Sequence, residues 1–325
     1  MDLRLKKERK ASLGILPTPL MPLKRLSRRY HCEMWMKRDD LIGMGMGGNK
    51  TRKLEYLLGE ALEKHCDTVI TAGAVQSNHC RQTAAACARL GLECHLLLGG
   101  CEQPAQGNLL LDHLFGAKIH WAGSSRKGED MELLAENLKK QGRKIYLIPY
   151  GGSDAVGALG FVYAVEELLI QEKQMNIQTD AILFASSSGG TQAGLVVGNQ
   201  FYRAGKQVYG IGIDKSPTGE PDTREKIEEI VATITDQSGL SMPEPDIQLN
   251  GDFMDRPYAE CGELEKHAMT VFAREEGVVL DPVYTGRAFG GLLRLLEAGM
   301  FKNRKILLWH TGGAPAIFAY HSQLT

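Results

Sequence analysis

Short β-rich runs alternate with longer segments of helical periodicity along almost the whole chain, and this alternation limits the folds that the chain can adopt. The β-rich runs predict strands at Met34–Lys37, Thr68–Thr71, Cys94–Leu98, Ala117–Trp121, Lys144–Pro149, Ala181–Ala185, Val208–Ile213, Val278–Asp281 and Lys305–His310. The segments between them predict helices at Thr51–Lys64, Asn78–Leu90, Asn108–Phe115, Asp130–Gln141, Val156–Lys173, Thr191–Ala204, Thr223–Gln237, Gly262–Glu276 and Arg287–Ala298. Strands and helices in this succession form βαβ units, so we expect an α/β fold with parallel sheets buried on both faces.

The βαβ units are too many for one open sheet of usual size, so we expect two parallel-sheet, three-layer domains. Glycine-rich joints at Gly43–Gly48 and Gly151–Gly157 mark the expected boundaries. We therefore expect residues 51–150 to form a small α/β domain, and residues 1–50 together with 151–325 to form a large one. A cleft between two such domains is a common binding site for a small molecule.

Composition excludes several classes of partner. The 325 residues carry 38 basic and 39 acidic side chains, a formal net charge of −1, so neither nucleic acid nor a membrane surface is expected to bind. No apolar run approaches the roughly 20 residues of a membrane span, and no secretory signal is visible. Seven cysteines without a CxxC pair indicate free thiols in a reducing cytoplasm, and we expect no metal site.

The stretch Gly47–Glu55, GGNKTRKLE, delivers Lys50 to the predicted start of a helix immediately after two glycines and an asparagine. The same stretch is also compatible with a solvent-facing lysine in a turn, with Thr51 as an ordinary helix cap.

Three other stretches place polar residues where a strand ends and a helix begins. In Thr71–Ala86, Ser77 or Asn78 occupies the expected N-cap, and Gln76 to His79 surround the free backbone N–H groups of a helix start, which bind an anion such as a carboxylate. In Ala185–Gly194, serines, glycines and Thr191 form a compact cradle that fits one phosphate, although neither Walker A nor GxGxxG spacing is present.

The third such region consists of Leu280–Gly291, LDPVYTGRAFGG, and Leu307–Ala316, LLWHTGGAPA. Both segments put hydroxyl side chains just past the end of a predicted strand: Tyr284, Thr285 and Thr311. A tyrosine in such a position also packs commonly as a structural aromatic residue.

A lysine, a cradle for one phosphate, a helix start suited to a carboxylate and hydroxyls at strand ends together suggest pyridoxal 5'-phosphate as cofactor. A lysine can form a Schiff base with the aldehyde carbon of this cofactor when its amine is unprotonated, and burial or a nearby cation makes that possible by lowering the pKa of the amine.

In these motifs the chain resembles the pyridoxal-phosphate family that joins D-cysteine desulfhydrases and 1-aminocyclopropane-1-carboxylate deaminases, within the tryptophan-synthase-β-like fold (fold type II). The matching motifs are Leu16–Leu20 (LPTPL), Lys37–Asp40 (KRDD), GGNKTRKLE, AGAVQSNH, Pro149–Ser153 (PYGGS), SGGTQAG, DPVYTG and HTGGAPA. They are collinear and extend from near the N-terminus to near the C-terminus.

The resemblance implies that the cofactor lies in the interdomain cleft, bound by the large domain. It implies that Lys50 is the Schiff-base lysine and that Ser77, Asn78 and His79 hold the substrate carboxylate, with Asn78 also near the 3-oxygen of the ring. It further implies phosphate binding at Ser188, Gly189, Gly190 and Thr191, and a place for Tyr284 against the cofactor on the substrate side.

Two positions favour the desulfhydrases over the deaminases. Deaminases of this family carry a glutamate after the tyrosine of DPVY and a leucine after the histidine near the end, where this chain has Thr285 and Thr311. We expect one of these threonines to face the pyridine nitrogen, and Asp281 to shape the turn before it. The segment Asp255–Glu260 departs from the family pattern, although Tyr258 matches its substrate-side tyrosine, and Arg287 replaces the usual lysine.

We therefore expect a homodimeric lyase that catalyses α,β-elimination on a small amino acid, with D-cysteine as the leading substrate and Lys50, Ser77 and Tyr284 as catalytic residues. L-cysteate sulfo-lyase and 1-aminocyclopropane-1-carboxylate deaminase are the alternatives among enzymes. Arg256 and Arg287 either meet a sulfonate or serve as surface charge and structural ion pairs, the reading we favour. A protein that binds the cofactor without turnover is the alternative from another class.

Overall fold

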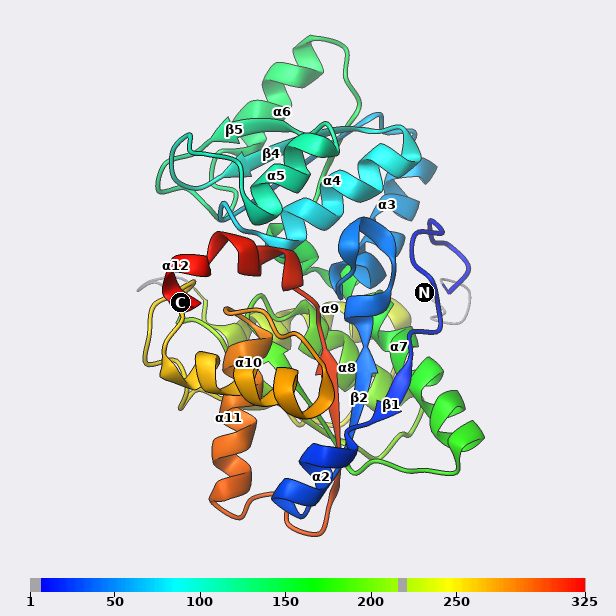
Figure 1. Cartoon of the computed structure of the whole chain (residues 1–325). Helices are drawn as coiled ribbons and strands as arrows, with labels where there is room; N and C mark the ends of the chain where they lie inside the picture. Colours follow the sequence, from blue (N-terminus) through cyan, green and yellow to red (C-terminus); the bar gives the residue numbers. More distant parts are fainter. Residues whose placement is uncertain (1–6, 216–220, 325) are drawn as a thin grey trace.

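The computed structural model describes residues 7–215 and 221–324 and contains two sheets, one in each of two α/β units that lie one above the other in Figure 1. The strands of the lower, six-stranded sheet lie in the order β1 (Leu20–Pro22), β2 (Glu33–Arg38), β10 (Lys305–His310), β7 (Ala181–Ser186), β8 (Gln207–Gly212) and β9 (Gln248–Asn250). Those of the upper, four-stranded sheet lie in the order β5 (Lys118–Trp121), β4 (Glu93–Leu98), β3 (Thr68–Gly73) and β6 (Ile145–Leu147). Every pairing is parallel except that of β1 with β2.

The described helices are α2 (Lys24–Tyr30), α3 (Lys50–Glu63), α4 (Asn78–Leu90), α5 (Gly107–Leu114), α6 (Met131–Lys140), α7 (Ala155–Met175), α8 (Gly190–Phe201), α9 (Thr223–Ser238), α10 (Glu263–Glu276), α11 (Thr285–Glu297) and α12 (His321–Leu324). Each helix expected from the sequence is present. Its ends differ from the expected ends by at most two residues, except that α8 ends three residues earlier than expected. Short 3₁₀ turns follow several strands: η1 (Asp39–Leu41), η2 (Met44–Met46), η3 (Tyr150–Gly152) and η4 (Ala314–Ala319).

Both sheets are covered on both faces, which confirms the three-layer architecture. In the six-stranded sheet, Leu308 belongs to one core with α10 and α11, while its neighbour Trp309 belongs to another with α7, α8 and α9. In the four-stranded sheet, Val69 packs with α3, α4 and α5, and Ile70 packs with α6. Successive strand residues point to opposite faces, so near-continuous apolar runs are what a doubly covered sheet requires.

The expectation of a strand at Val278–Asp281 is wrong. This segment is extended and largely buried, but it pairs with no strand and leads into α11. The side chains of Val278 and Leu280 pack into the core, and the carbonyl of Val279 lies 3.0 Å from Nε2 of His310. The two edge strands β1 and β9 were not expected, since three residues are too few to show a strand pattern.

Helix α3 joins the two units. Its leucines Leu54, Leu57 and Leu58 pack with the four-stranded sheet, while Tyr56 packs with α7 of the other unit. At the crossing with α7, a Cβ atom on Gly160 would lie 2.2 Å from the carbonyl oxygen of Arg52, so only glycine permits this close approach. The four-stranded sheet lies within residues 51–150, and we keep the division of the chain at residues 50 and 150 as a prediction.

No helix among residues 7–215 and 221–324 combines the length and the hydropathy that a bilayer crossing requires.

Candidate active site

Lys50 is the first residue of α3 and follows a turn that requires glycine. Gly47 has a φ of 76°, and a Cβ atom on it would lie 1.8 Å from the carbonyl oxygen of Asp40. The backbone N–H of Asn49 donates to the carbonyl of Thr311 at 3.0 Å. The turn is therefore tied to the segment that follows β10, at the carboxyl ends of the parallel strands, where ligands bind in sheets of this kind.

The amine of Lys50 has the properties of a nucleophile. Burial lowers the pKa of this amine to about 8, so a larger fraction is unprotonated near neutral pH than in an exposed lysine. Its charge also acts on two neighbours, because it lowers the pKa of both Lys53 and His79 after the larger effect of burial.

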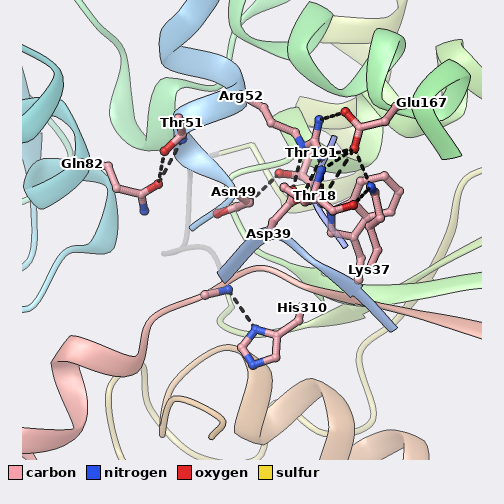
Figure 2. A network of polar contacts seen from close by, with 12 residues as sticks. Thr18, Lys37, Asp39, Asn49, Thr51, Arg52, Gln82, Glu167, Thr191 and His310 are labelled. Atoms are coloured by element: carbon pink, nitrogen blue, oxygen red, sulfur yellow. Dashed lines mark hydrogen bonds and ion pairs between the residues drawn. The ribbon is translucent and has the colours of Figure 1, made fainter. Parts of the chain in front are cut away.

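A buried ionic network holds the start of α3 in place (Figure 2). The guanidinium of Arg52 donates to both oxygens of Asp39 at 2.8 Å and to Glu167 of α7 at 2.9 Å. Lys37 donates to the same glutamate. Although burial opposes ionisation, these cations lower the pKa of Glu167 to about 2. The network fixes the helix that carries Lys50 to the six-stranded unit, and no local sequence pattern predicts these pairings.

Two further contacts in Figure 2 connect the Lys50 turn to the neighbouring helix starts. The amide of Asn49 donates to the hydroxyl of Thr191 at 3.1 Å, at the start of α8. The backbone N–H of Thr51 donates to Gln82 of α4 at 3.0 Å. Because Asn49 is the N-cap of α3, the reading of Thr51 as a helix cap is wrong.

The start of α4 contains the three residues predicted to hold a carboxylate. Ser77 is the N-cap, and its hydroxyl accepts from the N–H of Cys80 at 3.2 Å. The side-chain oxygen of Asn78 accepts from Asn108 at 2.8 Å, which orients its amide. The free N–H groups of this helix start remain suited to an anion.

The ring of His79 turns away from the helix start. Its Nε2 atom lies 2.8 Å from the hydroxyl of Thr71, and Nδ1 has no hydrogen-bond partner among the described residues. Burial, followed by the charges of Lys50 and Lys53, holds the pKa of His79 well below its usual value, so the ring is neutral. The role of His79 in holding a carboxylate stays a prediction.

The predicted phosphate cradle lies at the start of α8. Gly189 is the N-cap with a φ of 84°, and the hydroxyl of Ser188 lies 2.7 Å from that of Ser153. A Cβ atom on Gly190 would lie 2.8 Å from the hydroxyl of Ser153 and 2.9 Å from Nζ of Lys53. The glycine thus keeps open the space that a serine hydroxyl, an ammonium group and the N–H groups of a helix start all face.

Lys53 is a member of this cradle that sequence reasoning missed. Its buried amine donates to Ser153 at 2.9 Å and to the carbonyl of Gly151 at 3.2 Å. No carboxylate lies within 4 Å of it in the described part of the chain. Burial holds its pKa well below the usual value, and an anion at the cradle would remove that penalty. The signal was its position three residues after Lys50, which places both amines on one face of α3.

Tyr258 and Tyr284 form a pair. Their hydroxyls lie 2.6 Å apart, and their rings meet edge to face at a centroid distance of 6.1 Å. Burial holds the pKa of both phenols well above the usual value, so both are protonated at neutral pH. The structure thus brings the two predicted substrate-side tyrosines together.

The two threonines differ in what their hydroxyls can still bind. Thr285 donates to Asp281 at 2.7 Å and accepts from the N–H of the same residue at 2.8 Å. Asp281 also accepts from the N–H groups of Val283 and Tyr284, so it shapes the turn as expected. The hydroxyl of Thr311 makes no hydrogen bond within the described residues.

The structure assigns structural roles to Arg287. It is buried, pairs with Glu265 at 2.7 Å and donates to the carbonyls of Ile213, Arg256 and Glu260. These partners occupy four of its five N–H donors, so the interpretation as a structural ion pair is confirmed and a role as sulfonate ligand finds no support. Arg256 is exposed, with its side chain against Gly262.

The donor set fits pyridoxal phosphate: an amine with a lowered pKa, a second buried amine with no carboxylate within 4 Å among the described residues, and a glycine-lined cradle at a helix start. A family model described as pyridoxal-phosphate dependent enzyme matches residues 11–312. The chain belongs to this family of enzymes.

Several similar proteins carry the names of two kinds of enzyme within this family. A protein from Pyrococcus abyssi (strain GE5 / Orsay), named a putative 1-aminocyclopropane-1-carboxylate deaminase, is 40% identical over 315 residues, which cover 94% of this chain and 92% of the relative. A D-cysteine desulfhydrase from Serratia proteamaculans (strain 568) is 40% identical over 318 residues, which cover 94% of each. The crystal structure of an ACC deaminase homologue matches with a TM-score of 0.90 at 38% identity, covering 97% of this chain and 95% of that one. These matches confirm the resemblance and the type II fold.

Proposed function

We propose that this enzyme is a pyridoxal-phosphate-dependent lyase that catalyses α,β-elimination on a small β-substituted amino acid, with D-cysteine as the leading substrate. The products from D-cysteine are pyruvate, sulfide and ammonia. The observation that carries the proposal is the open space at Gly190, which the hydroxyl of Ser153 and Nζ of Lys53 face, on the same helix as the Lys50 amine whose pKa burial lowers to about 8. The D-cysteine desulfhydrase from Serratia proteamaculans supports the substrate.

In this proposal the residues divide the work by position. Ser188, Gly189, Gly190 and Thr191, with Lys53, hold the phosphate, and Lys50 binds the cofactor covalently between turnovers. When bound, the cofactor supplies the electron sink that stabilises negative charge at the substrate Cα.

On the substrate side, the α4 start, with Ser77 and Asn78, binds the carboxylate. Lys50 Nζ then takes the Cα proton, the Cβ–S bond breaks, and the sulfur leaves with the electron pair. The Tyr258–Tyr284 hydroxyl pair, protonated at neutral pH, faces the departing group and holds a proton for it.

We further propose that Thr311 faces the pyridine nitrogen, with Thr285 supporting the turn behind it. The hydroxyl of Thr285 is saturated by Asp281, whereas that of Thr311 retains its donor. A neutral hydroxyl leaves the nitrogen largely unprotonated, which suits elimination of a good leaving group.

Replacing Lys50 tests the assignment. Lys50→Ala is expected to abolish sulfide release from D-cysteine and the visible absorption of the covalently held cofactor. Lys64→Ala, an exposed lysine at the end of the same helix, is the matched control. A Lys50→Ala protein that retains wild-type turnover would refute the proposal.

The alternative reactions are separated by products. L-cysteate would release sulfite, and 1-aminocyclopropane-1-carboxylate would give ammonia without sulfide. Assays of sulfide, sulfite, pyruvate and ammonia across both enantiomers of cysteine, L-cysteate, β-chloroalanine and the cyclopropane acid identify the substrate. Sulfite from L-cysteate without sulfide from D-cysteine would overturn the leading substrate.

A protein that binds the cofactor without turnover would need the cradle but not the carboxylate site. Ser77→Ala therefore separates the two classes. For an enzyme, the variant keeps the cofactor spectrum and loses catalytic efficiency. For a carrier, no amino acid perturbs the spectrum of the unmodified protein.

We also propose a cytoplasmic homodimer. The seven cysteines, all free thiols in the structure, support a reducing compartment. Light scattering after size exclusion tests the assembly: a dimer gives twice the 35.7 kDa mass of the chain, and a mass of one chain would contradict it.

A further inference from the structure

Arg126, in the loop between β5 and α6, reaches from the four-stranded unit to residues of the other unit. Its guanidinium donates to the hydroxyl of Tyr150 at 3.0 Å and lies 4.6 Å from the centroid of the Tyr258 ring. That ring belongs to the tyrosine pair on the proposed substrate side. The stacking geometry is one in which a cation is attracted by the face of an aromatic ring.

Arg126 also lines a cavity of about 370 Å³, together with Gln76, Tyr258 and Val283. Gln76 directly precedes Ser77, and Val283 directly precedes Tyr284, so the cavity opens beside the groups proposed to hold the substrate. The other described lining residues are apolar, or polar without charge. Arg126 is therefore the source of positive charge for whatever group enters this cavity.

The guanidinium retains hydrogen-bonding capacity. Asp214 forms an ion pair with the guanidinium at 3.7 Å, which is longer than a hydrogen bond, so this carboxylate offsets part of the charge without occupying an N–H donor. Tyr150 takes one of the five N–H donors that a guanidinium carries. A planar fork with spare donors at the edge of a neutral cavity is suited to a sulfonate or a carboxylate.

We propose that Arg126 is a specificity-determining residue that receives the oxyanion end of a β-substituent, so that amino acids with a β-sulfonate or a comparable acidic group enter this site as substrates. The inference rests on the proposed elimination. For a β-sulfonate, Lys50 takes the Cα proton, the Cβ–S bond breaks, and the electron pair leaves with sulfite. Arg126 lies over the ring of Tyr258, and among the described residues neither Arg256 nor Arg287 makes such a contact with the tyrosine pair.

The test compares selectivity, because loss of Arg126 can loosen Tyr258 and slow every substrate. The measured quantity is the ratio of kcat/KM for L-cysteate to that for β-chloroalanine, an uncharged substituent. Arg126→Gln is expected to lower this ratio by about tenfold or more, the effect of removing a charge-assisted hydrogen bond. Arg126→Lys, which keeps the charge without the planar fork, should give an intermediate ratio. Lys127→Gln removes one charge from the same loop and should leave the ratio unchanged.

A second readout does not depend on turnover. 3-Sulfopropanoate has the carboxylate and the sulfonate but no amino group, and calorimetry on the holoenzyme should show weaker binding to Arg126→Gln than to the wild type. A ratio unchanged in Arg126→Gln, an equal fall for both substrates, or a wild type that rejects β-sulfonates would each overturn the inference. Failure of the wild type to eliminate chloride from β-chloroalanine would instead overturn the proposed elimination.

Discussion

Replacing Lys53 with methionine separates the two roles that the structure gives this residue. The buried ammonium faces the start of α8, with Ser153 at 2.9 Å and no carboxylate within 4 Å among the described residues. A charge-assisted hydrogen bond to phosphate contributes about 1.5–3 kcal/mol. Lys53→Met should therefore weaken cofactor binding by roughly 10- to 150-fold. The assay is titration of the apoprotein with pyridoxal phosphate, followed by its visible absorption.

The stability of the apoprotein should instead increase in Lys53→Met. Burial lowers the pKa of Lys53 in the folded state, so the unfolded chain binds more protons and this contribution to stability rises with pH toward the unfolded value. Lys53→Met should remove that slope and stabilise the apoprotein at neutral pH in urea unfolding.

Lys64→Met, exposed at the end of the same helix, is the control for both measurements. If Lys53→Met binds the cofactor as tightly as the wild type, Lys53 does not hold the phosphate and the reasoning fails.

Two further predictions concern buried charges. Glu167→Gln should lower the free energy of unfolding by about 3 kcal/mol, because it removes the negative charge that Arg52 and Lys37 share. Urea titration measures this free energy, and a loss below about 1 kcal/mol would contradict the prediction. The carboxyl group of Asp112 has no hydrogen-bond partner among the described residues, and burial raises its pKa to about 8. Its contribution to stability should therefore fall as pH rises from about 4 through 8, a slope that Asp112→Asn should abolish; identical pH profiles for the two proteins would exclude this role.

The sequence predicted most of the elements around the site for a physical reason. Strands buried on both faces and amphipathic helices leave patterns in consecutive residues, so β3 and β7 with their following helices α4 and α8, and strand β10, were predicted. The same reasoning predicted a strand at Val278–Asp281 wrongly, because an apolar run indicates burial but not hydrogen-bonded pairing with another strand.

Side-chain partnerships over long separations could not be predicted. Arg52 and Glu167 are 115 positions apart, and nothing local marks them as a pair. Arg126 is similar, since its importance arises only where its loop meets Tyr258 of the other unit. The role of Lys53 could have been predicted, because its spacing from Lys50 places both on one face of a helix. The choice between Thr285 and Thr311 could not, because it depends on the contacts of Asp281.

The most direct test of the account is to locate the covalent link between protein and cofactor. Borohydride reduction of the holoenzyme, followed by proteolysis and mass spectrometry, should find the reduced cofactor on the amine of Lys50. The nearby Lys53 should remain unmodified, although both amines lie on one face of α3. Modification of Lys53 in place of Lys50, or no modified lysine at all, would contradict the central claim.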